Sequence, residues 1–271
     1  MSNEPQSQSG ILEEMTIEGV RAMSPRVVML GIGSTEPHGP HLPYGTDLYQ
    51  TDAVCRRAVT RANDRGARVL MYPTLPISTN ANFQAFPFAC RIGVRTLMNV
   101  LLDIIEALEQ DGIRKVVLVN GHGGNPDVVR ATVREHVGRR RPGEGAFVCM
   151  TSTTDVVPEE ARAIVEHPSD HAGENETSRM LHLRPDLVRP EKFDDFLVQK
   201  PTIDHLRSGR MFFVRPWHGY IPASAGGETR SSSAEKGQTL TDAGADWLAD
   251  FLVALAESPW HDQFPYPPAS Q

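Results

Sequence analysis

Short apolar runs alternate along the chain with longer stretches in which apolar residues recur every three or four positions. The runs that predict β-strands cover residues 27–32, 68–72, 116–119 and 146–150. The stretches that predict helices cover residues 47–63, 94–110, 174–183 and 241–257, with a further helix opening at Pro126. This alternation is typical of a layered α/β fold, in which a mostly parallel central sheet carries helices on both faces.

The ends of several predicted elements coincide with residues that favour such ends. Thr46 is placed to cap the helix that follows it, and Asn125 is placed to cap the helix that opens at Pro126. Pro73 is expected to end the second strand, and Gly112 to stop the long helix before it.

The chain is expected to form one domain. Its 271 residues suit a single α/β enzyme, and no repeat or linker marks a second unit. We expect the domain at residues 16–257, between a flexible N-terminal tail at 1–15 and a C-terminal tail at 258–271. Residues 198–230 are rich in Gly, Pro and aromatic residues without a clear period, which indicates a long ordered loop near a site or a subunit contact.

Charge and composition narrow the classes of partner. A formal net charge of -7 argues against a general nucleic-acid binder, whose affinity would depend on neutralising phosphates. The 3 cysteines are too scattered for a disulfide framework, which favours a reducing cytoplasm. The first ten residues do not resemble a secretory signal, and no stretch reaches the roughly 18 apolar residues of a membrane span. We therefore expect a small-molecule substrate, with no nucleic acid and no membrane.

The first group of chemically active residues follows the first predicted strand. Residues two apart in extended backbone point the same way, so Glu36 and His38 can converge on one cation. Asp47 returns through a loop punctuated by Pro and Gly, and its two oxygens can bridge two metals. His41 falls out of step with this alternation, so we expect it to support the loop. Taken alone, the Glu36 and His38 pair fits a polar surface loop equally well.

Two further clusters lie downstream. His122 follows the strand at 116–119 and is flanked by glycines, so it can approach an ion without steric shielding. The same turn has an alternative use in cradling phosphate, although it lacks the spacing of a nucleotide loop. The third cluster contains His171, Glu174 and Glu176, of which the two carboxylates can instead be favourable charges in the first turn of a helix.

Together the three clusters predict a metal site beyond the carboxyl ends of the strands. Mixed histidine and carboxylate ligands suit zinc, manganese or iron, and the shortage of thiols argues against a closed structural zinc site. The chemistry indicated is hydrolysis by a metal-activated water, with His171 or Glu174 protonating the leaving amine. A nucleotide-binding or regulatory α/β protein without turnover is the alternative class.

These motifs resemble the creatininase family of creatinine amidohydrolases and related enzymes. The resemblance rests on residues 33–43, 45–47, 120–125, 171–173, 176–178 and 180–181, and order and approximate spacing agree over about residues 25 to 255. It implies a creatininase-like layered fold with two divalent metal ions per subunit, zinc and/or manganese or else iron.

The resemblance also assigns roles to single residues. Asp47 matches the bridging carboxylate, and the terminal ligands are matched by Glu36, His38 and His122. Glu176 matches a position that supplies a further carboxylate, and His171 matches a histidine placed near the substrate. Members of the family form hexamers, so a homo-oligomer is expected.

The resemblance is weaker where substrate would be recognised. Residues 82–89 and the pair Gly123 and Gly124 depart from the family pattern, which argues against creatinine as substrate. We expect hydrolysis of a C–N bond in a small cyclic amide or formamide. The alternatives are a ring-opening hydrolase of a cyclic ketone such as an inosose, and a peptidase that matures a peptide.

Overall fold

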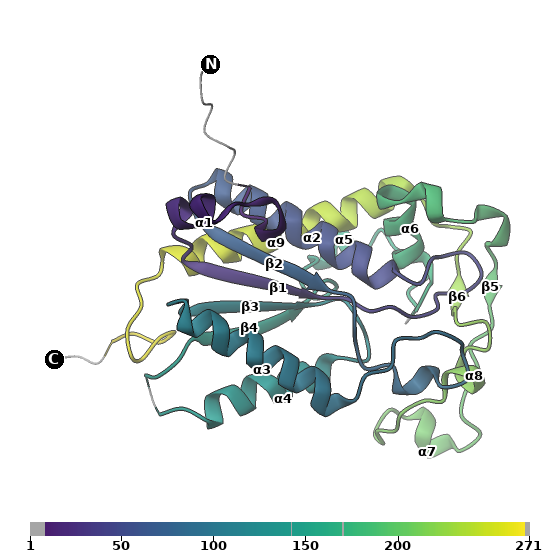
Figure 1. Ribbon diagram of the computed structural model, residues 1–271. Helices are drawn as coiled ribbons and strands as arrows, with labels where there is room; N and C mark the ends of the chain where they lie inside the picture. Colours follow the sequence, from purple (N-terminus) through teal and green to yellow (C-terminus); the bar gives the residue numbers. More distant parts are fainter. Residues whose placement is uncertain (1–8, 142, 170, 269–271) are drawn as a thin grey trace.

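The computed structural model describes residues 9–141, 143–169 and 171–268. Its centre is a four-stranded sheet in the order β2-β1-β3-β4 (Figure 1). The strands are β1 (Val27–Ile32), β2 (Val69–Leu75), β3 (Lys115–Asn120) and β4 (Phe147–Ser152). Each neighbouring pair runs parallel, so the predicted α/β class is confirmed.

Helices cover both faces of this sheet (Figure 1). Side chains alternate along each strand, so Met29 of β1 packs into the core on one face and Leu30 into the core on the other. The first core is closed by α2 (Thr46–Asp64) and α9 (Ala234–Glu257), and the second by α3 (Val94–Gln110) and α4 (Pro126–Gly138). Strands buried on both faces explain why the strand segments read as continuous apolar runs.

The remaining elements are short, apart from α6 (Glu174–Leu183), which packs along α9. The N-terminal part and the loops contain η1 (Leu12–Glu14), α1 (Ile17–Met23), η2 (Ala81–Phe83), α5 (Glu159–Arg162), η3 (Pro185–Leu187) and η4 (Pro190–Lys192). The loop region predicted at 198–230 contains α7 (Asp204–Arg207), α8 (Trp217–Tyr220) and β6 (Gly227–Glu228), and β6 pairs antiparallel with β5 (Asp195–Phe196).

Several predicted ends are moved by tertiary structure. β2 continues through Pro73 to Leu75, which is tolerated because β2 is an edge strand. α9 begins earlier than the apolar period indicated, because the Ser233 hydroxyl accepts a hydrogen bond from Lys236 N and caps the helix. Gly112 stops α3 as predicted, in a left-handed conformation with φ of 87°.

The two predicted capping side chains bind elsewhere. Thr46 is the first residue of α2, and its hydroxyl donates to Pro43 O at 2.7 Å. Asn125 does occupy the N-cap position of α4, but its side-chain oxygen accepts from Thr79 N at 3.3 Å. Both side chains therefore tie down loops beside the sheet, where the sequence predicted helix caps.

Parts of both predicted tails lie within the described residues and contact the rest of the domain. Residues 1–8 and 269–271 of those tails lie outside the described residues. Ile11 is buried, and Gly10 O accepts a hydrogen bond of 2.7 Å from Met71 N of β2. Near the other end, the rings of Phe264 and Phe147 lie 5.1 Å apart. Among the described residues, every helix is too short or too polar to cross a membrane.

Candidate metal centre

The candidate site lies where the order of the strands reverses. From β1 the chain passes through α2 to β2 at the sheet edge, and then through α3 on the opposite face to β3. The loops after β1 and β3 therefore lead to helices on opposite faces of the sheet, and the point between them is the usual ligand position in such sheets. Gly121 N donates to Ile32 O at 2.8 Å and holds the two strand ends together.

Asp47, in the first turn of α2, is the centre of the cluster. Its Oδ1 lies 3.1 Å from Nε2 of His38, and its Oδ2 lies 3.1 Å from Nδ1 of His122. The side chain is almost completely buried. The two oxygens of this carboxylate therefore face two different imidazoles.

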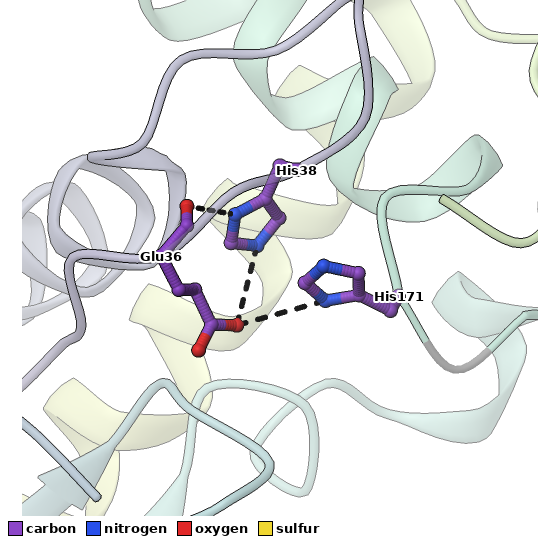
Figure 2. A group of neighbouring side chains, drawn as sticks. All are labelled: Glu36, His38 and His171. Atoms are coloured by element: carbon purple, nitrogen blue, oxygen red, sulfur yellow. Dashed lines mark hydrogen bonds and ion pairs between the residues drawn. The ribbon is translucent and has the colours of Figure 1, made fainter. Parts of the chain in front are cut away.

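Two more carboxylates complete the arrangement. Oε2 of Glu36 lies 3.1 Å from His122 Nδ1. The other oxygen, Oε1, lies 3.9 Å from His38 Nε2 and 3.7 Å from His171 Nδ1 (Figure 2). Oε2 of Glu176 lies 3.6 Å from His38 Nε2. The residues form three overlapping triplets, and within each triplet the possible ligand atoms lie within 4.8 Å of one another. The triplets are Glu36, His38 and His171; Glu36, Asp47 and His122; and His38, Asp47 and Glu176.

Each of the three histidines in these triplets has one ring nitrogen next to a backbone carbonyl. His38 Nδ1 lies 3.0 Å from Glu36 O, His122 Nε2 lies 3.2 Å from Thr79 O, and His171 Nε2 lies 2.9 Å from Pro37 O. A carbonyl oxygen only accepts, so these nitrogens carry the hydrogens. In the neutral rings, the other nitrogens then direct their lone pairs toward the carboxylates. Metal-binding histidines are held in this way, so the residues present fit a divalent cation.

The ionisation of the cluster agrees with this fit. Burial alone would lower the pKa of His38, but Asp47, Glu176 and Glu36 raise it to about 10. Burial likewise opposes charge on His122, whose pKa the carboxylates of Glu36 and Asp47 raise well above its usual range. Burial raises the pKa of Asp47, yet the two histidines hold that pKa below its usual range. The buried carboxylates thus require positive charge next to them, which a cation would supply.

His171 differs from the other two histidines. Burial, together with the nearby His38, lowers the pKa of His171 to about 4. Its ring centroid lies 4.2 Å from that of His38, and 5.5 Å from those of both Phe83 and Trp217. His171 is therefore a neutral imidazole at neutral pH, between the carboxylate cluster and an aromatic wall.

Two residues of the sequence motifs bind outside the cluster. The oxygens of Glu174 accept hydrogen bonds of 2.6 Å from Lys236 Nζ and from His167 N, so this carboxylate faces α9 and belongs to none of the three triplets. Nε2 of His41 lies 2.9 Å from Thr177 Oγ1. His41 therefore has the supporting position in the loop that the sequence predicted.

Other residues of the site were not singled out in the sequence. Ser34 donates a hydrogen bond to Glu36 Oε2, and its position two residues before Glu36 is the signal that could have identified it. Phe83 and Trp217 line the site through their contacts with His171. No sequence pattern connects these two aromatic residues to the metal motifs, because only the fold brings them together.

Fold and site define an α/β protein with a candidate metal centre at the switch point of its sheet. The sequence profile of the creatininase family, described as creatinine amidohydrolase, matches residues 13–252. The chain therefore belongs to the creatininase family and is a hydrolase of that family.

Relatives in this family have different named activities. The mycofactocin precursor peptide peptidases of Mycobacterium ulcerans and Mycobacterium tuberculosis are 31% and 32% identical to this chain, and the alignments cover 61% and 68% of both chains. The creatinine amidohydrolase of Pseudomonas putida is 29% identical, over 83% of this chain and 88% of its own. The 3-dehydro-scyllo-inosose hydrolase of Thermotoga maritima is 23% identical, over 90% of this chain and 83% of its own.

Solved creatininase structures share the fold along nearly the whole chain. A creatinine amidohydrolase crystal structure superposes with a TM-score of 0.78 at 26% identity, over 93% of this chain and 100% of its own. A manganese form of creatininase and a Zn–Zn form of a creatininase variant give TM-scores of 0.77 and 0.76. Both are 25% identical and cover 92% of this chain and 99% of their own. The structural neighbours thus include both manganese and zinc forms.

Proposed function

We propose that the protein is a metal-dependent hydrolase with two divalent cations per subunit, zinc and/or manganese, that cleaves a C–N bond of a small cyclic amide or formamide. The observation that carries this proposal is the position of Asp47, whose two oxygens each face a different histidine at 3.1 Å. The manganese and Zn–Zn forms of similar creatininases support the choice of metals.

The donors divide into two sets around Asp47. One set consists of Glu36 Oε2, Asp47 Oδ2 and His122 Nδ1, and the other of His38 Nε2, Asp47 Oδ1 and Glu176 Oε2. When bound, the cations supply an acidified water and an electrophilic partner for the carbonyl oxygen of the substrate. The chain itself holds the ligands in place through the carbonyls that fix the histidine rings.

His171 is the proposed proton carrier. It is neutral at neutral pH, because burial and the nearby His38 lower its pKa to about 4, and Nδ1 is the ring nitrogen that carries no hydrogen. It can accept a proton at Nδ1 and then deliver it to the nitrogen of the leaving amine. Glu174, the other candidate, is bound to Lys236 and lies outside the cluster, so we assign it no proton transfer.

The surroundings of the cluster support a small substrate. Glu36 and His38 are at most 1% exposed to solvent, and Phe83 and Trp217 pack next to His171. A flat, compact amide fits such a wall better than a bulky polar molecule.

Two further substrate classes are supported by specific relatives. A peptide is favoured by the identity of 31% and 32% with mycofactocin precursor peptide peptidases, and the amide bond in a peptide needs the same chemistry. A cyclic ketone opened by hydrolysis is favoured by the similarity to an inosose hydrolase. Formation of an amine in the product would separate the amides, formamides and peptides from the cyclic ketones.

The test combines metal analysis with a substrate screen. Purified protein is expected to contain about two divalent ions per chain, and a panel of cyclic amides, formamides, peptides and inososes is assayed before and after removal of metal by a chelator. Asp47→Asn is expected to lose both metal and turnover, because it removes the charge that both donor sets share. Full turnover in the chelated protein, or in a metal-free Asp47→Asn variant, would contradict the proposal.

A further inference from the structure

A network of completely buried polar side chains lies behind Glu36. Ser34, Ser78 and Asn80 each have 0% exposure. Ser78 Oγ donates to Ser34 Oγ at 2.5 Å, Asn80 Nδ2 donates to Ser34 Oγ at 3.0 Å, and Ser34 Oγ lies 3.2 Å from Glu36 Oε2. Of these contacts, only the last reaches a residue of the metal cluster.

The direction of these hydrogen bonds follows from the surroundings of Asn80. Its Nδ2 also donates to Cys90 O at 2.9 Å, and a backbone carbonyl can only accept, so the amide presents its NH₂ group to Ser34. With Ser78 and Asn80 both donating, the two lone pairs of the Ser34 hydroxyl are used. Its single hydrogen therefore remains for Glu36 Oε2.

This hydrogen bond fixes the rotation of the Glu36 carboxylate. Oε2, which accepts from Ser34, is the oxygen that lies 3.1 Å from His122 Nδ1, whereas Oε1 faces His38 and His171 at 3.9 Å and 3.7 Å. The Ser34 hydroxyl thus acts on the donor set that contains His122 and Asp47 Oδ2. The other donor set, which contains His38 and Glu176, does not include the oxygen that Ser34 holds.

We propose that Ser34 is a positioning residue that sets the affinity of the cation position at His122, and that it acts there more strongly than at the position at His38. The inference rests on the proposed function, because it assumes that the two donor sets bind cations. Groups that orient metal ligands typically change metal affinity by about 10- to 100-fold when they are removed.

Ser78 provides a matched control. Ser34→Ala and Ser78→Ala each delete one hydroxyl from the same buried network. Ser34→Ala removes the hydrogen bond to Glu36, whereas Ser78→Ala leaves Ser34 free to donate to it. Glu176→Gln is the opposite control, since it weakens the donor set at His38.

The experiment is a calorimetric titration of metal-free protein with Zn²⁺ or Mn²⁺, with circular dichroism to check folding. Wild type is expected to show two binding steps. Ser34→Ala should weaken one step by about 10- to 100-fold and leave the other within about threefold, while Ser78→Ala changes neither step by more than about threefold. Glu176→Gln should weaken the step that Ser34→Ala spares.

The role of Ser34 would be overturned if Ser34→Ala left the affinity of both binding steps unchanged or weakened both equally. It would also be overturned if Ser34→Ala and Ser78→Ala lost the same affinity, or if Ser34→Ala and Glu176→Gln weakened the same step. If Ser34→Ala does not fold, Ser34→Cys replaces it in the Mn²⁺ titration, because a thiol is a weak donor of similar size and Mn²⁺ prefers oxygen ligands to sulfur. Wild-type Mn²⁺ binding by Ser34→Cys would overturn the role as well. Absence of divalent-cation binding by the wild type would instead overturn the proposed function itself.

Discussion

At the scale of single residues, His171 and Glu174 show how closely spaced residues can have separate tasks. We expect His171→Gln to lower kcat by about 10²- to 10⁴-fold without loss of bound metal, because the neutral imidazole would be the proton carrier.

Glu174→Gln should keep kcat within severalfold and lower the free energy of unfolding by about 1–3 kcal/mol, because it weakens the hydrogen bond from Lys236. Steady-state kinetics, metal analysis and urea unfolding measure these effects. The reverse pattern would assign proton transfer to Glu174.

Glu109 gives a prediction about pH and stability. Burial raises its pKa, but hydrogen bonds from Ala146 N, His136 and Arg140 outweigh burial and hold the pKa below its ordinary value of 4.5. A lowered pKa in the folded state means that ionised Glu109 stabilises the fold above about pH 4.5, and that this stabilisation is lost as the pH falls through the folded-state pKa.

Glu109→Gln is therefore expected to lower the free energy of unfolding by about 1–3 kcal/mol at neutral pH. The difference from wild type should begin to shrink as the pH falls below about 4.5, where the carboxylate of the unfolded state becomes protonated, and should be lost through the lower folded-state pKa. Urea unfolding of both proteins at a series of pH values measures this difference. A gap that stays constant from neutral to acid pH would argue against a role for the charge.

The residues of the candidate site were predictable where the spacing of residues along the chain fixes which way the side chains point. Glu36 and His38 were found from the alternation of extended chain, and the structure brings both to the cluster. In the third cluster, the residues alone did not separate Glu174 from Glu176, although residues two apart on a helix point to different sides. Glu176 faces His38, while Glu174 faces Lys236 of α9.

At the scale of elements, the close contact of α6 and α9 depends on a glycine. A Cβ on Gly237 would overlap Ser178 O of α6, so Gly237→Ala should force the helices apart although alanine favours helix. We expect a loss of about 1–3 kcal/mol in unfolding free energy, and weaker metal binding because α6 carries Glu176. Gly138→Ala in α4 is the control, since a Cβ there has open space. Equal stability of the two variants in thermal unfolding would contradict this account.

The bounds of the elements were predictable where the local pattern alone decides them. β1, α3 and α6 begin and end where the apolar period predicts. Pro73 was expected to end β2, but whether proline is tolerated depends on the strand lying at the sheet edge, which local sequence does not specify. Asn125 was expected to cap α4, but Thr79, distant in sequence, takes its side chain.

At the scale of the whole molecule, a run of exposed apolar side chains lies on the loop that contains α7. Its members are Leu197, Val198, Ile203, Met211, Phe212 and Val214, with exposures between 40% and 83%. Apolar patches of this kind commonly mark protein contacts, and we propose that another copy of the chain covers this one.

Phe212→Glu is therefore expected to reduce the molar mass of the particle in solution, measured by light scattering after size exclusion. The introduced carboxylate would have to be buried in the subunit contact. Val137→Glu, at a residue of α4 that is 63% exposed, is the matched control and should leave the molar mass unchanged. A monomeric wild type, or an unaltered mass for Phe212→Glu, would show that this loop has another purpose.

The location of the cluster at the reversal of strand order also bears on how this scaffold can diversify. Of the proposed cation donors, Asp47 and Glu176 stand in first helical turns, and Glu36, His38 and His122 in the loops that follow β1 and β3. Phe83 and Trp217 belong to the short helices η2 and α8. The proposed metal ligands and the aromatic residues beside them thus belong to different segments of the chain. Exchange of the surrounding segments could redirect the enzyme to another compound while its reaction centre stays intact, which would account for relatives as unlike as a peptidase and an inosose hydrolase.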